Sequence, residues 1–279
     1  MASYAFQQVD VFSAVPFKGN PLAVIVGAND LTDQQMAAIA NWTNLSETTF
    51  LLRPHHPQAD YRVRIFTPER ELPFAGHPTL GSCHAWLAAG NAPRGDDVVQ
   101  ECGVGLVRIR RDGKRLAFAA PPLQRSGEVA PDMLARIARA LQIDPARIRA
   151  SQWVDNGPGW VAVMLSTAAE VLAIERSYAA LPGQSLGVVG PWDGRQGGGD
   201  AQFEVRAFVG TRPAEDPVTG SLNAGLAQWL IGAGLAPDAY VASQGTALGR
   251  AGRVHVARIG ADIWIGGETA TCIEGRLNA

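Results

Sequence analysis

Short stretches of alternating or continuous apolar residues run through most of this chain, a pattern that is typical of strands with one or both faces buried. Before residue 120 these stretches are YAFQQVDVF, GNPLAVIV, TTFLL, YRVRIF, GLVRIRR and RLAFAA. After it they are GWVAVML, SLGVVG, QFEVRAFV, RVHVARI and DIWIGG. The pattern predicts a chain that is mostly β.

Two segments, 78–89 and 222–233, have apolar or small residues on nearly all faces. Such a helix is expected to be buried on every side, so each is predicted to be a central helix with the strands of its half wrapped around it. The expected boundaries are Pro78 in a first helical turn, Ser221 as an N-cap, and Gly90 and Gly234 at left-handed C-terminal positions.

The two predicted central helices belong to an internal repeat. ELPFAGHPTLGSCHAWLAAG, residues 71–90, resembles EDPVTGSLNAGLAQWLIGAG, residues 215–234, at a spacing of 144 residues (71 + 144 = 215). Six of the twenty positions match, more than the one or two that background usage gives. The matching pairs are Glu71 with Glu215, Pro73 with Pro217, Gly76 with Gly220, Gly81 with Gly225, Ala89 with Ala233 and Gly90 with Gly234.

The repeat predicts an α+β fold of two pseudo-symmetric domains, each a barrel-like sheet around a central helix. The expected domains are residues 1–120 and 121–279, with the last few C-terminal residues able to pack back on the first. A short helix over about 33–41, opened by a Thr32–Gln35 capping box, and an amphipathic helix, DMLARIARAL, complete the prediction.

Composition narrows the possible functions. The 279 residues are 47% hydrophobic and 18% charged with a net charge of -2, so an ordinary globular protein is expected and nucleic acid is not an expected partner. The start lacks a signal-peptide pattern and no apolar run has the length of a membrane span, which favours a cytoplasmic protein without membrane association. Neither the three cysteines nor the histidines show metal-ligand spacing, and no nucleotide-binding glycine motif is present.

The predicted central helices also suggest a place for chemistry. A helix N-terminus offers N–H groups and positive potential, and Gly76 and Gly220 have no side chain to block a ligand. If the halves pack about a pseudo-two-fold axis, both N-termini can face one cleft and bind a small carboxylate. The alternative is that both are only capped core helices.

Four side chains are candidates for the chemistry at this cleft: Glu47, His77, Asp216 and Ser221. Glu47 lies at the mouth of an apolar strand, where partial burial would suit a general base. A solvated carboxylate at a strand end is the alternative for Glu47. His77 and Asp216 can equally be turn or cap residues.

These motifs resemble the PhzF-like (phenazine biosynthesis) family, which has the diaminopimelate epimerase-like fold. The resemblance covers almost the whole chain, through VDVFSAVPFKGNPLAVI, NLSETTF, RIFTPERELPFAGHPTLG, EDPVTGS, QGTALGRAGRVHV and IWIGG. It implies two barrels, each around a central helix, an active site between them, a homodimer, and isomerisation without cofactor or metal. The family's characterised reaction is the isomerisation of trans-2,3-dihydro-3-hydroxyanthranilate.

Residue roles carried over from the resemblance are specific. Glu47 would be the acid/base that moves a proton between carbons, with His77 and Asp216 as polar partners of the substrate. Ser46, Gly76, Gly220 and Ser221 would help to hold the substrate, its carboxylate near the helix N-termini.

Related epimerases use two cysteines at the helix starts. Ala75 and Thr219 precede Gly76 and Gly220 here, so a two-cysteine racemase is disfavoured.

The leading hypothesis is a cofactor-independent isomerase acting on a small cyclic or unsaturated amino or hydroxy acid. A non-catalytic protein that binds a carboxylate metabolite in the same cleft is the alternative. An interaction or scaffold protein is a third possibility and would require a large apolar surface patch.

Overall fold

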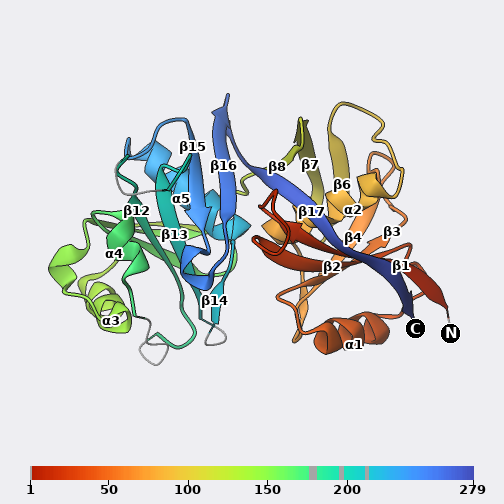
Figure 1. Cartoon of the computed structure of the whole chain (residues 1–279), viewed down its shortest axis with the longest axis horizontal. Coiled ribbons are helices and arrows are strands. Elements are labelled where there is room, and N and C mark those ends of the chain that lie inside the picture. Colours follow the sequence, from red (N-terminus) through yellow and green to blue (C-terminus); the bar gives the residue numbers. More distant parts are fainter. Residues whose placement is uncertain (1, 176–180, 195–197, 211–213) are drawn as a thin grey trace. The chain divides into compact units, whose positions relative to one another are not determined.

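The computed structural model describes residues 2–175, 181–194, 198–210 and 214–279 (Figure 1). The chain forms two compact units. Unit 1 contains the residues up to Ala119 together with Gly266–Ala279, and unit 2 contains Ala120–Ile265. The chain therefore leaves unit 1 once and returns to it with its last strand.

Unit 1 is an eight-stranded closed barrel. Its strands are β1 (Ser3–Val11), β2 (Asn20–Val26), β3 (Thr48–Leu52), β4 (Tyr61–Phe66), β6 (Val98–Cys102), β7 (Gly105–Asp112), β8 (Arg115–Ala119) and the second part of β17 (Asp262–Asn278). They pair in the order β1–β2–β3–β4–β6–β7–β8–β17, and β17 closes the ring on β1. The pairs β2–β3 and β4–β6 are parallel. The short strand β5 (Glu71–Leu72) adds to the end of β4.

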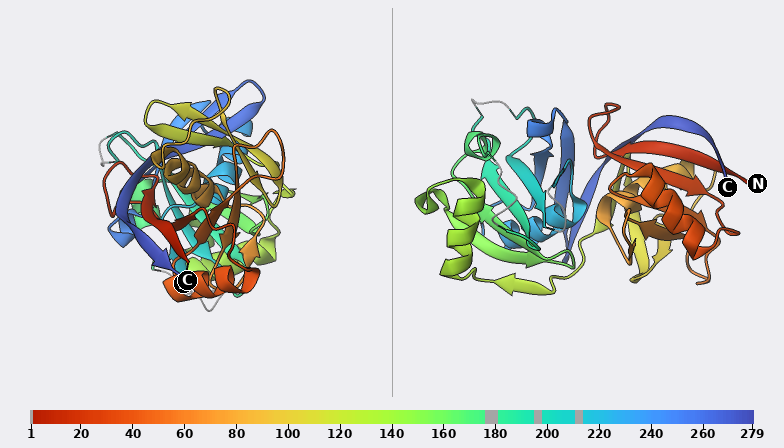
Figure 2. Two further views of the ribbon diagram at one scale, coloured as in Figure 1. Left: turned by 90° about the vertical axis from the view of Figure 1, so that its right-hand side faces the viewer. Right: turned by 90° about the horizontal axis from the view of Figure 1, so that it is seen from below.

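The helix α2 (Gly76–Ala88) fills the inside of this barrel, as Figure 2 shows in its left-hand view. It packs closely because Gly81 faces β1 and β2: a Cβ atom there would lie 2.6 Å from Leu22 Cδ2 and 2.9 Å from Val11 Cγ2. The helix α1 (Asp33–Thr43) lies outside, with its buried Met36 and Ala40 on apolar residues of β1 to β4. Its predicted capping box is confirmed.

Unit 2 repeats this connectivity. Its strands are β9 (Arg125–Gly127), β10 (Ala150–Asp155), β11 (Trp160–Met164), β12 (Ser185–Pro191), β13 (Phe203–Val209), β14 (Ala214–Asp216), β15 (Ala239–Gln244) and β16 (Gly252–Ile259). The antiparallel pair β10–β11, the parallel pair β11–β12, the antiparallel pair β12–β13 and the parallel pair β13–β15 follow the order of β1 to β6. The predicted pseudo-symmetric α+β fold is confirmed.

The central helix of unit 2 is α5 (Gly220–Gly232), and its Gly225 is as close to the sheet as Gly81 is in unit 1. A Cβ atom at Gly225 would lie 2.2 Å from the carbonyl oxygen of Val154 on β10. The helices α3 (Pro131–Leu141) and α4 (Ala168–Leu172) lie outside and share an apolar core with β10 to β12. The described part of unit 2 also contains the short 3-10 turns η1 (Pro145–Arg147) and η3 (Thr246–Leu248).

Both central helices begin two residues earlier than predicted. Their N-caps are Ala75 and Thr219, and neither cap side chain bonds the first turn, so the prediction of Ser221 as an N-cap is wrong. Ser221 lies inside the first turn instead. The C-terminal prediction is confirmed, because Gly90 and Gly234 have φ of +86° and +69°.

Candidate functional site

In unit 1 the structure brings Glu47 and His77 together. Glu47 follows Ser46 in the turn between α1 and β3, a turn that Asn44 opens in the left-handed conformation with φ of 53°. His77 is the second residue of α2, directly after Gly76. The distance between Glu47 Oε2 and His77 Nε2 is 3.3 Å, and the two side chains are only 16% and 6% exposed. The side chain of Glu47 is therefore largely buried beside the start of α2.

His77 is a neutral imidazole at neutral pH. Burial lowers its pKa to about 3, because the charged form would lose its hydration. Its second ring nitrogen, Nδ1, lies 3.3 Å from Nδ2 of Asn20, the first residue of β2. Asn20 therefore contacts the ring within the barrel, and Glu47 Oε2 approaches Nε2 from the other side in a contact that lacks hydrogen-bond geometry.

A buried aspartate orders the loop that leads to Asn20. Asp10 Oδ2 accepts hydrogen bonds from the backbone N–H groups of Lys18 and Gly19, each at 2.7 Å. Neither Asp10 nor Asn20 was a candidate from the sequence. The available signal was a polar residue between the apolar Val9 and Val11 of an otherwise apolar strand end, since a buried carboxylate needs nearby donors.

In unit 2 the corresponding segment carries Asp216. It lies at the end of β14, and its Oδ2 accepts a hydrogen bond of 2.5 Å from the hydroxyl of Thr219. That hydroxyl in turn accepts a 2.9 Å bond from Gln244 Nε2, which also donates to the Asp216 carbonyl at 3.0 Å. Gln244 is buried, and its Oε1 accepts from the Thr219 backbone N–H at 3.0 Å. The sequence analysis did not single out Thr219 or Gln244 as partners of Asp216.

Ser221 is the second residue of α5, next to the buried Gly220. Its hydroxyl oxygen accepts a 3.0 Å bond from the indole N–H of Trp160, the first residue of β11. The loop before Trp160 is anchored by Asp155, whose Oδ1 accepts from the backbone N–H groups of Gly157 and Gly159. Ser221 is therefore inside the first turn of α5, where its hydroxyl binds Trp160 and not the helix start.

The strand that carries Asp216 is fixed by a buried ion pair. Glu215 accepts two hydrogen bonds from Arg206 on β13, at 3.0 Å and 2.9 Å, and the side chains are 5% and 1% exposed for Arg206 and Glu215. Arg206 Nη1 also donates to the carbonyls of Val171 and Ile174. A two-point pair of this kind fixes both partners in orientation as well as distance.

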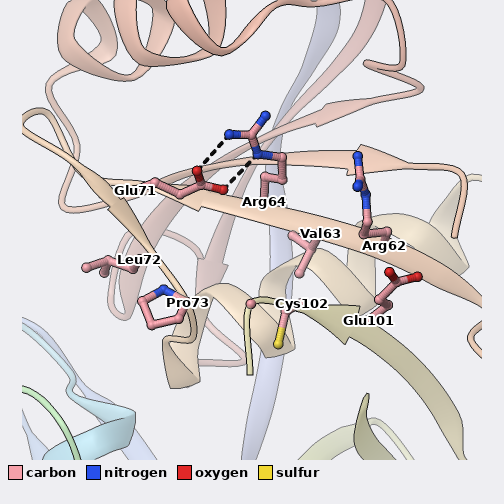
Figure 3. A pocket seen from close by; sticks show the side chains of 9 residues that line it. Arg62, Val63, Arg64, Glu71, Leu72, Pro73, Glu101 and Cys102 are labelled. Carbon is pink, nitrogen blue, oxygen red and sulfur yellow. Dashed lines mark hydrogen bonds and ion pairs between the residues drawn. The ribbon is translucent and has the colours of Figure 1, made fainter. Parts of the chain in front are cut away.

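Unit 1 has the matching pair, Arg64 with Glu71, at the edge of an open pocket (Figure 3). The pocket has a volume of about 450 Å³. Its lining comes from β4, β5 and β6: Arg62, Val63, Arg64, Glu71, Leu72, Pro73, Glu101, Cys102 and Gly103. None of the predicted site residues lines it.

The predicted residues thus form two groups. Gly76 and His77 form the start of α2 and Glu47 lies against His77, with Ser46 directly before Glu47 in the chain, whereas Asp216, Gly220 and Ser221 lie around the start of α5. A single site made from both groups stays a prediction. Over the described ranges, no cluster of three metal-ligating side chains occurs. No helix within those same ranges is long and apolar enough to cross a bilayer.

Comparison with known proteins identifies one family and several relatives of this chain. Residues 9–275 match the family described as phenazine biosynthesis-like protein. Antisense-enhancing sequence 1 of Schizosaccharomyces pombe is 34% identical and covers 99% of both chains. An uncharacterized isomerase of Pasteurella multocida is 34% identical over 91% of this chain and 86% of its own. Trans-2,3-dihydro-3-hydroxyanthranilate isomerase of Pseudomonas aeruginosa is 36% identical over 62% of this chain and 61% of its own.

Solved structures agree on the fold. A PhzF family phenazine biosynthesis protein from Enterococcus faecalis superimposes with a TM-score of 0.83 at 26% identity, covering 100% of both chains. A hydroxyproline epimerase from Agrobacterium vitis has a TM-score of 0.57 at 12% identity, covering 99% of this chain and 92% of its own. The second likeness extends to the fold alone.

Proposed function

This chain belongs to the family of phenazine biosynthesis-like proteins, among whose relatives are named isomerases, and on that premise we propose that it is an isomerase that needs no cofactor. Its substrate would be a small cyclic or unsaturated amino or hydroxy acid. The reaction would move one proton from one carbon of the substrate to another. The observation that carries the proposal is the 3.3 Å approach of Glu47 to the neutral His77 at a helix start.

Glu47 would be the group that carries the proton. As a carboxylate it takes the proton from one carbon, and as the resulting carboxylic acid it returns that proton to another, so the enzyme ends as it began. His77 is a poor alternative, because an imidazole with a pKa of about 3 is too weak a base to take up a second proton at neutral pH. Its role would be to direct its one N–H to Glu47 or to the substrate.

The substrate carboxylate would bind at the helix starts. Neither Ala75 nor Thr219 caps its helix with a side chain, so the first-turn N–H groups of α2 and α5 are not used by a cap. Such groups bind anions, and oriented donors near the reacting carbon stabilise the charge that develops when a proton leaves. Gly76 and Gly220 would allow the substrate to approach these N–H groups, and Asp216 and Ser221 would supply polar contacts.

The test is proton exchange at carbon. We expect the protein to convert trans-2,3-dihydro-3-hydroxyanthranilate, the compound named for the Pseudomonas aeruginosa relative, or to exchange its carbon-bound hydrogen in D2O. Glu47→Gln should lower the rate by about 10²–10⁴-fold, the usual contribution of a general acid–base. Glu69→Gln, an exposed glutamate of the same unit, is the matched control and should leave the rate unchanged.

The competing function is binding without turnover. A wild-type protein that binds the compound but exchanges no hydrogen, with the same affinity after Glu47→Gln, would favour the carboxylate-binding alternative. Conversion that Glu47→Gln leaves intact would remove Glu47 from the mechanism while leaving an isomerase.

A further inference from the structure

Both units direct a side-chain N–H onto the second residue of the central helix. In unit 1 the donor is Asn20, which opens β2, and the acceptor is His77 Nδ1 at 3.3 Å. In unit 2 the donor is Trp160, which opens β11, and the acceptor is Ser221 Oγ at 3.0 Å. Donors and acceptors differ in chemistry, but they occupy the same places in the repeated fold.

The support behind each donor is repeated as well. The strand before it ends near an aspartate that accepts two backbone N–H bonds from the intervening loop: Asp10 from Lys18 and Gly19, and Asp155 from Gly157 and Gly159. Asp10 is 2% exposed, so these bonds are shielded from water. Asn20 follows this loop directly, which fixes where its amide points.

The contact with Asn20 determines which nitrogen of His77 carries hydrogen. A neutral imidazole has one donor and one acceptor nitrogen. If the Asn20 amide donates to Nδ1, the hydrogen is on Nε2, which lies 3.3 Å from Glu47 Oε2. The other tautomer would place the lone pair of Nε2 against a carboxylate oxygen. The tautomer with hydrogen on Nε2 is therefore the one that avoids two facing lone pairs at 3.3 Å, a contact that itself lacks hydrogen-bond geometry.

We propose that Asn20 is a positioning residue that holds His77 as the tautomer with hydrogen on Nε2. Trp160 does the equivalent for Ser221, because an indole N–H is a donor only and leaves the serine hydroxyl hydrogen for another acceptor. The proposal rests on the proposed function and deepens it: His77 presents its Nε2–H to Glu47 or to the substrate and transfers no proton itself. Glu47 is then the single proton carrier of unit 1.

Imidazole ¹⁵N NMR on histidine-labelled protein at neutral pH tests this directly. The chain has five histidines, and His77→Gln identifies the signal of His77 by its loss. We expect an unprotonated Nδ1 and a protonated Nε2 in the wild-type protein. A protonated Nδ1, or a ring in rapid exchange between tautomers, would overturn the proposal, and this measurement needs no variant of Asn20 to fold.

The Asn20→Asp variant then tests whether the side chain at position 20 determines the protonation of His77. A carboxylate at position 20 and Glu47 at the other nitrogen both require N–H, so both nitrogens of His77 should become protonated. Asn29→Asp is the matched control, because Asn29 lies beyond the opposite end of β2, is exposed, and uses only its Oδ1, which aspartate keeps. A folded Asn20→Asp protein whose His77 signals match the wild type would contradict the proposal.

The two proposals fail separately. The NMR signature of His77 requires no substrate, so a protein without isomerase activity can still show it. If activity is present, Asn20→Asp should lower kcat at least about tenfold, because a positive charge beside Glu47 makes its carboxylate a weaker base. An active protein with the wrong tautomer would refute the role of Asn20 and leave the isomerase proposal standing.

Discussion

Each unit has an arginine on a barrel strand that binds a glutamate on the short strand beside it through two hydrogen bonds. In unit 1, Arg64 and Glu71 are 20% and 42% exposed, and the remaining Arg64 donor reaches the exposed Asp33. In unit 2, Arg206 and Glu215 are 5% and 1% exposed, and Arg206 also bonds two backbone carbonyls. The Arg–Glu pair therefore has the same two-bond geometry in both units, although it is partly exposed to water in unit 1 and buried in unit 2.

The difference in burial between the two ion pairs correlates with the residue that comes after the glutamate. After Glu71 comes Leu72, whereas after Glu215 comes Asp216, a candidate for contact with the substrate. A buried pair needs both partners and holds them firmly, whereas an exposed pair contributes little because water competes for each charge. The buried, more firmly held ion pair therefore lies in unit 2. There it fixes the strand that carries Asp216, a polar residue of the proposed site.

The largest effect is expected from Glu215→Gln. Removing one charge of a buried pair leaves Arg206 uncompensated, which should lower the free energy of unfolding by about 3–5 kcal/mol. Glu71→Gln, the same change in the exposed pair, should cost no more than about 1 kcal/mol. Urea unfolding of both variants gives the two values, and equal losses would show that burial of the pair in unit 2 has no energetic consequence.

An intermediate effect is expected from two buried titratable groups, one in each unit. Burial raises the pKa of Glu204 to about 7 and lowers that of His77 to about 3. Between about pH 4.5 and 7 a larger fraction of Glu204 is protonated in the native state than in the unfolded state. The contribution of Glu204 to stability is therefore lost as pH rises. Between about pH 6.5 and 3 a larger fraction of His77 is protonated in the unfolded state than in the native state. The contribution of His77 to stability is therefore lost as pH falls.

Each group should change the free energy of unfolding by up to about 1.4 kcal/mol per pH unit, with opposite signs. The two slopes should largely cancel between pH 4.5 and 6.5. Glu204→Gln should then make stability rise more steeply with pH over that range, and His77→Gln should make it fall. Denaturant titrations at a series of pH values measure both slopes, and a change of the wrong sign in either variant would refute the corresponding pKa shift.

The smallest effects are expected where the central helices touch their barrels. A Cβ atom at Gly225 would meet a backbone carbonyl at 2.2 Å, whereas one at Gly81 would meet side-chain methyl groups at 2.6–3.0 Å, which can rotate away. Gly225→Ala should therefore cost about 2 kcal/mol. Gly81→Ala should cost less than about 1 kcal/mol, since alanine also favours the helix by about that amount. Thermal unfolding ranks the two, and the reverse order would mean that the β10 backbone yields more easily than the Leu22 and Val11 side chains.

Local sequence patterns were sufficient to predict that the two units share a fold. Apolar periodicity predicted β1 to β4, β7, β8, β11 to β13, β16, the start of β17 and the two buried helices, but it missed β6, β10 and β15. The 144-residue spacing predicted that the halves share a fold. Gly90 and Gly234 were predictable as helix ends because the left-handed conformation is a property of the residue itself. Glu47 and His77 were candidates from their motifs, and the structure places them 3.3 Å apart.

The helix starts were not predictable in the same way. The preference of serine for N-caps pointed to Ser221, but its hydroxyl accepts from Trp160, a residue 61 positions away in the chain. The bond from Asn20 to His77 spans 57 positions, and the bond from Gln244 to Thr219 spans 25. Such partners are determined by how strands and helix pack together, and no local preference of either residue reports them.

The return of the chain to unit 1 has a consequence for synthesis on the ribosome. Unit 2 is one continuous segment, so all of its residues have been made once Ile265 has been added. The barrel of unit 1 cannot close then, because the strand that joins β8 to β1 is the last to emerge. The nascent N-terminal segment, which includes Asn20, Glu47 and His77, keeps two unpaired strand edges, those of β1 and β8, while unit 2 is translated. Unpaired edges of this kind are sites of aggregation and of chaperone binding.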